Sequence, residues 1–180
     1  MIKKDFLNTL QWSFVIFVSF YMITYGAAKF TQFGEISEYS RPLFSYQGMD
    51  IMWAFYSYSK TYAVILGLFE ILGSLLFLIP KTRIIGGLVL STILINIILQ
   101  NYFYDVHRGA MANAITYQIL IIIVFFMNKE KLIAMIKSSS INFSFQRKKI
   151  VLRILLILVL LFVLMLAQEG VGLLLNILKI

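Results

Sequence analysis

The sequence of 180 residues contains no cysteine, one histidine and only eight acidic residues. The lack of cysteine excludes disulfides, thiol redox relays, iron–sulfur clusters and thiolate metal sites. The single histidine, His107, has no second histidine with which to form a metal site, and alone it gives little support to haem. No G-x-G-x-x-G, P-loop, G-x-S-x-G or H-E-x-x-H motif occurs, so catalysis by the isolated chain has no support in the sequence.

Charged residues are also scarce, at 13% of the chain, whereas 61% of residues are hydrophobic and the mean hydropathy is +0.89. A soluble domain of this composition would expose large apolar patches and aggregate. The composition therefore predicts a polytopic membrane protein. The net charge of +8 includes no basic stripe with recognition spacing, so it indicates loops near anionic lipid rather than a nucleic-acid partner.

Five apolar runs, at 11–28, 62–79, 84–103, 110–127 and 150–167, are each long enough to span a bilayer as a helix. The first run is longer than the core of a signal peptide, which favours a spanning helix. We predict an all-α fold in which residues 1–127 form a four-helix transmembrane core and residues 128–149 form a basic cytoplasmic linker. Residues 150–180 are expected to form a fifth, peripheral transmembrane helix and a tail, because run 150–167 lacks a polar stripe.

A long aromatic loop at 30–60 separates the first two runs and is expected on the outer side of the membrane. Asp50 predicts the cap of a helix at 51–59, since its carboxylate can accept from the first backbone N–H groups. That helix is interpreted as interfacial or as the first turns of the second span, because amphipathic aromatics favour the interface. The alternative is a loop that folds over the bundle as a lid.

The basic residues are distributed unequally between the two sides of the predicted bundle. Five spans place the two chain ends on opposite sides, and cytoplasmic loops carry the excess of Lys and Arg. We therefore predict a bacterial inner-membrane protein with a cytoplasmic N-terminus and a periplasmic or extracellular C-terminus. The eleven on the N-terminal side are Lys3, Lys4, Lys81, Arg83, Lys129, Lys131, Lys137, Arg147, Lys148, Lys149 and Arg153, and the five on the other side are Lys29, Arg41, Lys60, Arg108 and Lys179.

Glu70 is the only acidic residue inside the apolar runs, roughly 15 Å along a helix from Pro80. An ionisable group at this depth needs a partner or a water-filled cavity. Gly67 and Ser74 share its helix face, and small residues at such spacing let another helix approach closely. The acid and its small neighbours predict a packed face with a polar centre.

Polar side chains on the other three core spans face the same region, which predicts an outward-facing pocket around Glu70. Polar stripes on apolar helices must face protein rather than lipid, although they also serve simply to hold helices together. No residue is assigned a catalytic or metal-binding role. The pocket or proton-handling candidates are Glu70, Asn96, Gln100, Tyr21, Thr24, Asn113 and Tyr117, and those at the pocket mouth are Lys29, Asp105, His107 and Arg108.

The stretches GLFEILG at 67–73 and LLFLIPKTR at 75–83, followed by Gly86, resemble the DoxX-like family of small membrane proteins. GAAKF at 26–30, Asn96 and NYFYDV at 101–106 extend the resemblance over spans one to four. The resemblance implies a four-helix membrane core, and family members are associated with quinone-linked oxidation and with membrane complexes in oxidative stress. No cofactor is evident from the residues themselves, and quinone is implied by the resemblance alone.

The sequence supports three functional hypotheses. The first is an accessory or partner subunit of a larger inner-membrane complex, which the added fifth helix, basic linker and long first loop would suit. The second is a quinone-linked oxidoreductase membrane subunit in which Glu70 handles protons. The third is a small transporter or a lipid- or solute-binding membrane protein that uses the outward pocket. The expected partners are the lipid bilayer and other membrane protein subunits.

Overall fold

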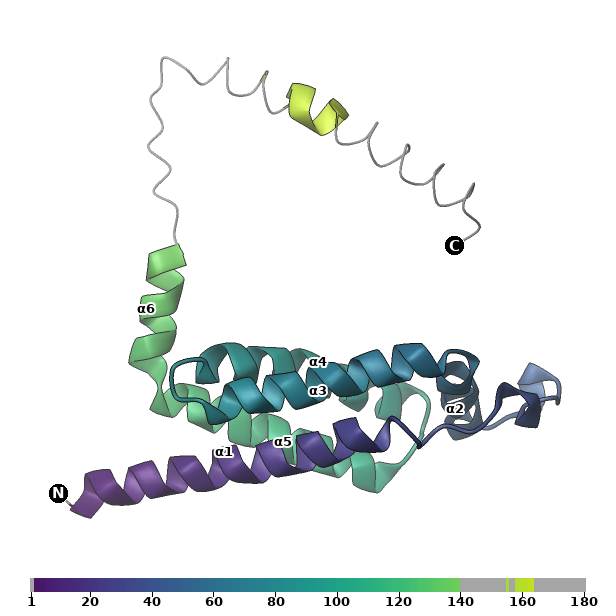
Figure 1. Ribbon diagram of the computed structural model, residues 1–180, viewed down its shortest axis with the longest axis horizontal. Helices are drawn as coiled ribbons and strands as arrows, with labels where there is room; N and C mark the ends of the chain where they lie inside the picture. Colours follow the sequence, from purple (N-terminus) through teal and green to yellow (C-terminus); the bar gives the residue numbers. More distant parts are fainter. Residues whose placement is uncertain (1, 140–154, 156–157, 164–180) are drawn as a thin grey trace. The chain divides into compact units, whose positions relative to one another are not determined.

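Figure 1 shows the computed structural model of the chain, which describes residues 2–139, 155 and 158–163. Helices and the loops between them account for these described residues, which contain no strand. The helices are α1 (Ile2–Ala28), η1 (Ile36–Glu38), η2 (Leu43–Ser45), α2 (Gly48–Tyr58), α3 (Lys60–Leu78), α4 (Arg83–Phe103), α5 (Arg108–Met127) and α6 (Lys129–Ser139).

Among the described residues, four helices, α1, α3, α4 and α5, are long and apolar enough to cross a membrane, and they pack as a bundle (Figure 1). Within the bundle α1 packs against α3 and α5, and α4 packs against the same two helices. The all-α polytopic fold that the composition predicts is confirmed. The buried apolar core consists of Val15, Val18, Met22, Phe77, Leu90, Leu94, Ala114, Tyr117, Ile121 and Val124.

A close backbone approach joins α1 to α3. A Cβ atom added at Gly67 would lie 2.4 Å from the carbonyl oxygen of Gly26, and one added at Gly26 would lie 2.6 Å from the carbonyl oxygen of Gly67. Farther along the same contact, the Ser19 hydroxyl donates to the Ser74 carbonyl at 3.4 Å. The small-residue face of α3 therefore packs on α1, because only glycine lets the two backbones come this close.

The turn between α3 and α4 is held by side chains that bond to the end of α3. The Thr82 hydroxyl donates to the Leu76 carbonyl at 2.9 Å, and the Arg83 guanidinium donates to the Phe77 carbonyl at 3.2 Å. Arg83 is buried, and its guanidinium lies 4.4 Å from the centre of the Trp12 ring. These bonds satisfy carbonyl groups that a helix C-terminus otherwise leaves unpaired inside an apolar bundle.

Helix α2 is separate from the second span and crosses the end of the bundle at which α3 begins (Figure 1). It begins at Gly48 rather than after Asp50, so the predicted cap is wrong by position: Gln47 is the N-cap, and the Asp50 carboxylate accepts from its backbone N–H at 3.4 Å. A Cβ added at Gly48 would lie 1.7 Å from the Tyr104 carbonyl oxygen. The first residue of α2 is thus packed directly against the end of α4.

The chain divides into two compact units, Met1–Lys137 and Ser138–Ile180, and the bundle belongs to the first. Part of the predicted basic linker is helical, as α6. Of the predicted fifth span at 150–167, only residues 155 and 158–163 are described, and these are helical. The rest of that span and the tail lie outside the described residues, so the peripheral fifth helix stays a prediction.

Replacing Gly67 by leucine is expected to lower the stability of the bundle by roughly 2 kcal/mol or more, because the new side chain collides with the backbone of α1. Thermal unfolding of the purified protein in mild detergent, followed by circular dichroism, measures the effect. Gly34→Leu is the control, since an added Cβ there meets only the movable Glu38 carboxylate. Equal melting temperatures for the two variants would contradict the packing described here.

Candidate functional site

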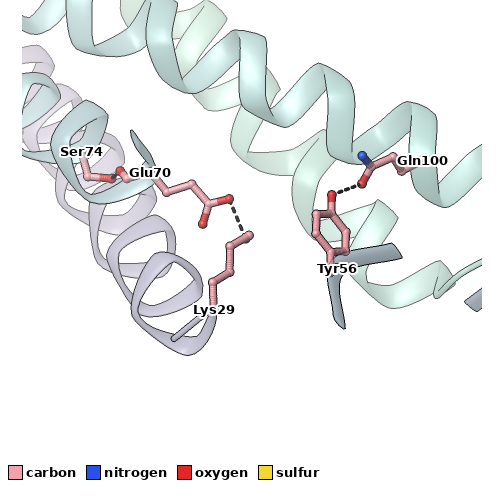
Figure 2. Close-up of polar contacts among 5 residues, drawn as sticks. All are labelled: Lys29, Tyr56, Glu70, Ser74 and Gln100. Atoms are coloured by element: carbon pink, nitrogen blue, oxygen red, sulfur yellow. Dashed lines mark hydrogen bonds and ion pairs between the residues drawn. The ribbon is translucent and has the colours of Figure 1, made fainter. Parts of the chain in front are cut away.

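The centre of the candidate site is an ion pair between Glu70 in α3 and Lys29 just after α1. Glu70 is completely buried, and its Oε1 lies 2.7 Å from the Lys29 ammonium nitrogen (Figure 2). The pair forms because the contact between Gly26 and Gly67 places the end of α1 one helical turn from the acid. The lysine that the sequence places at the pocket mouth therefore reaches inward and neutralises the buried carboxylate.

The second carboxylate oxygen of Glu70, Oε2, is buried and has no hydrogen-bond partner among the described residues. The hydroxyl of Ser74 donates to the backbone carbonyl of Glu70, at 2.7 Å, and not to its carboxylate. Glu70 lines a cavity of about 250 Å³ whose polar wall also includes Lys29, Asn96 and Gln100. A buried acceptor without a donor is costly, so this oxygen is the strongest indication of a binding site in the bundle.

A larger cavity of about 340 Å³ lies under α2, between the ends of α1, α4 and α5. Its wall is mostly apolar and aromatic and includes Met22, Phe33, Met52, Trp53 and Tyr117. Such a wall is typical of a pocket that binds an apolar group, in which a few polar side chains fix the orientation of the ligand.

Four residues, Lys29, Tyr56, Ile97 and Gln100, line both cavities and form the boundary between them. The Tyr56 hydroxyl donates to Gln100 Oε1 at 2.9 Å, and Figure 2 shows this pair opposite the Lys29–Glu70 pair. The Tyr56 ring also stacks on Phe33, with 4.8 Å between ring centres. Burial raises the pKa of the Tyr56 phenol above its ordinary value, so it stays a hydrogen-bond donor at neutral pH.

Three of the sequence-predicted pocket residues, Glu70, Asn96 and Gln100, line the same cavity together with Lys29. The Asn96 side chain is exposed and makes no hydrogen bond within the described part of the chain. Thr92, in the same wall, is exposed as well. Both residues lie midway along α4, so the exposed residues of this cavity wall belong to the side of the bundle.

The remaining predicted pocket residues do not line this cavity, and the single pocket formed by four spans stays a prediction. Tyr117 lines the larger cavity, and Tyr21 stacks on Tyr117 at 5.5 Å without lining either cavity. Asn113 is exposed and donates to the Tyr25 hydroxyl at 3.4 Å. Thr24 is also exposed, and its hydroxyl donates to a carbonyl of its own helix. Residues that helical spacing places on the same face of a helix therefore do not all line the same cavity.

Of the four residues predicted at the pocket mouth, Lys29 and His107 line one or both of these two cavities. His107 is the N-cap of α5, where its Nδ1 accepts from the Ala110 backbone N–H at 3.1 Å. Asp105 has a positive φ of 45° and shapes the turn between α4 and α5, a conformation that aspartate tolerates better than most residues. Arg108 is exposed at the start of α5. Asp105 and Arg108 thus belong to the turn and not to a cavity wall.

Sequence reasoning missed the contribution of α2, whose side chains Met52, Trp53 and Tyr56 close the larger cavity. The many aromatic residues of the loop at 30–60 are the feature of the sequence that could indicate this cavity wall. The interpretation of the loop as interfacial explains these residues without a cavity. The lid alternative comes closer to the observed arrangement, because α2 covers the end of the bundle.

The fold and the site define a polytopic membrane protein in which four spanning helices enclose a buried ion pair beside two cavities. The chain is 29% identical over 143 residues to the protein named "Uncharacterized protein YwoB" of Bacillus subtilis (strain 168). The match covers 78% of this chain and 91% of that relative. No protein-family model matches the chain, and no solved structure matches it.

Replacing Lys29 by methionine is expected to destabilise the protein by about 3 kcal/mol, because it leaves a buried carboxylate without its cation. The double variant Lys29→Met/Glu70→Gln is expected to regain part of that loss, since neither charge then remains. Denaturation by sodium dodecyl sulfate in mixed micelles measures the stability of Lys29→Met, of Glu70→Gln and of the double variant. If the two single effects add up to the effect of the double variant, the residues do not interact.

Proposed function

We propose that this integral membrane protein binds a small amphipathic molecule at the polar pocket around Glu70. The observation that supports the proposal is the buried Glu70 Oε2, which has no donor among the described residues and belongs to a residue that lines a cavity of about 250 Å³. A bound molecule that donates a hydrogen bond to this oxygen would remove the cost of leaving it unpaired.

The alternative role of Glu70, a polar contact that only holds helices together, accounts for Oε1 but not for Oε2. A purely structural ion pair is expected to have its remaining acceptors satisfied and to be closely packed. Here two cavities adjoin the pair, and Lys29 contributes to the walls of both. The arrangement is better suited to a site that admits another molecule than to a closed core.

The exposed wall residues of the smaller cavity support an amphipathic ligand in particular. Thr92 and Asn96 are exposed at the middle of α4, where the surface of a spanning helix meets lipid. A molecule already dissolved in the bilayer can reach the polar groups there without crossing the aqueous end of the bundle. The ligand is therefore proposed to partition into lipid and to carry at least one hydrogen-bond donor.

We propose a bacterial inner-membrane location with a cytoplasmic N-terminus. In the bundle, the start of α1, the α3–α4 turn and the end of α5 share one end, because neighbouring helices in the chain run in opposite directions. That end carries Lys81, Lys129 and Lys131, which fits the excess of basic residues on the cytoplasmic side. Helix α2 and the two cavities then belong to the outer half of the membrane.

The other hypotheses stay predictions. Within the described residues, no contact favours an accessory subunit of a larger complex or a quinone-linked oxidoreductase subunit over ligand binding. The resemblance to the DoxX-like family also stays a prediction, and with it quinone as a cofactor. A partner subunit and a bound ligand are compatible.

The test compares the small molecules that co-purify with the wild-type protein and with Glu70→Gln in mild detergent, by mass spectrometry of the extracted ligand. The wild type is expected to retain a bound amphipathic molecule, and Glu70→Gln is expected to lose at least ~90% of it, a tenfold weakening. Glu35→Gln is the matched control, because it removes an exposed carboxylate that pairs with Lys60. Equal occupancy in all three proteins would contradict the proposal.

A further inference from the structure

We infer that the bound molecule is an amphipathic amine, whose cationic head binds Glu70 Oε2 and whose apolar body occupies the larger cavity under α2. The inference rests on the proposed function and adds the chemical class of the ligand. Three features carry it: an unpaired carboxylate oxygen, a lysine ammonium group that already binds the same carboxylate, and an aromatic cavity that shares a wall with the polar one.

The head group is assigned from the hydrogen-bonding capacity of the wall. A carboxylate oxygen only accepts, so Glu70 Oε2 requires a donor, and a charged donor makes the strongest bond. Apart from Lys29, which is paired with Oε1, the other polar side chains of the smaller cavity, among them Thr92, Asn96 and Gln100, are neutral. An anionic head would meet Glu70 at short range in a medium of low dielectric, where repulsion between like charges is strong.

Lys29 lies beside the place that the ligand's ammonium group would take. Its nitrogen lies 2.7 Å from Glu70 Oε1, and its backbone N–H donates to the Tyr25 carbonyl of α1 at 3.3 Å, so only its side chain can move away from the acid. Two cations beside one carboxylate repel each other, so ligand binding requires the lysine to withdraw toward the interface, as long basic side chains do. Its withdrawal also removes one of the four side chains that separate the two cavities.

The apolar body is assigned to the larger cavity because of the side chains that line it. Met22 and Met52 adapt to irregular shapes, and the rings of Phe33, Trp53 and Tyr56 present flat apolar surfaces. Tyr56 lines both cavities, so its ring belongs to the wall that they share. A ring or short chain joined to an amine by one or two carbons would occupy both cavities at once.

The experiment measures binding of three probes to the full chain in mild detergent by titration calorimetry. The probes are 2-phenylethylamine, 2-phenylethanol and phenylacetate, which share a phenyl body and carry a cationic, a neutral and an anionic head. The amine is expected to bind at least ~10-fold more tightly than either of the others, because it alone forms a charge-assisted bond with Glu70.

Two substitutions are expected to change amine binding in opposite directions. Glu70→Gln removes the negative charge and should weaken binding at least ~10-fold, whereas Lys29→Met removes the competing cation and should strengthen it by a similar factor. Lys29→Arg keeps the ion pair and should give no gain. Lys60→Met, which removes an exposed lysine paired with Glu35, is the control and should leave binding unchanged.

A substitution in the larger cavity tests the position of the body. Ala114 is buried in its wall, and leucine at this position would fill part of the space. Ala114→Leu is expected to weaken binding of 2-phenylethylamine while Glu70 and Lys29 remain intact. Unchanged affinity would overturn the assignment of the body to this cavity.

The outcomes separate the inference from the proposed function. Tighter binding of phenylacetate, lost in Lys29→Met and strengthened in Glu70→Gln, would overturn the amine assignment and leave a ligand-binding protein with an anionic ligand. Equal binding of all three probes would also overturn it. If no probe binds and no molecule co-purifies with the wild type, both the inference and the proposed function fail. Should Lys29→Met not fold, the probe series and Lys29→Arg still decide the head group.

Discussion

The bundle depends on the neutralisation of one buried carboxylate in an apolar helix. Glu70 lies at the middle of α3, and the cost of leaving a charge unpaired there exceeds what the surrounding packing can offset. The cation comes from Lys29, which reaches the acid only because α1 and α3 touch at Gly26 and Gly67. The glycine contact and the ion pair both join α1 to α3, and together they fix the position of α1 along α3.

Helix α2 covers the end of the bundle and so closes the larger cavity beside the ion pair. Without it the ends of the spanning helices would open directly to the interface, and the space beside Lys29 would be a groove. The contact of Gly48 with the end of α4 and the stacking of Tyr56 on Phe33 fix α2 across that opening. The result is a polar cavity at the acid and an apolar one above it, which is the combination that an amphipathic molecule requires.

The spanning helices and the special status of Glu70 could be predicted from the sequence, because hydropathy and the cost of a buried charge act locally along the chain. The partner of the acid stayed open in the sequence, since a lysine just after a span, such as Lys29, suits the interface as well as a nearby acid. Helical spacing placed Thr24 on the pocket face, whereas the structure exposes it, because spacing defines a face but not the neighbour that covers it. The position of α2 rests on the contact of Gly48 with Tyr104, which no local pattern reveals.

The most direct test of the central claim is a solid-state nuclear magnetic resonance measurement of the distance between the Lys29 ammonium nitrogen and the Glu70 carboxyl carbon in lipid bilayers. Selective ¹⁵N-lysine and ¹³C-glutamate labelling in a Glu35→Gln background removes the signal of the exposed Lys60 pair. The account predicts strong dipolar dephasing that disappears in Lys29→Met. Dephasing that is absent, or that survives this substitution, would contradict the pairing on which the site is built.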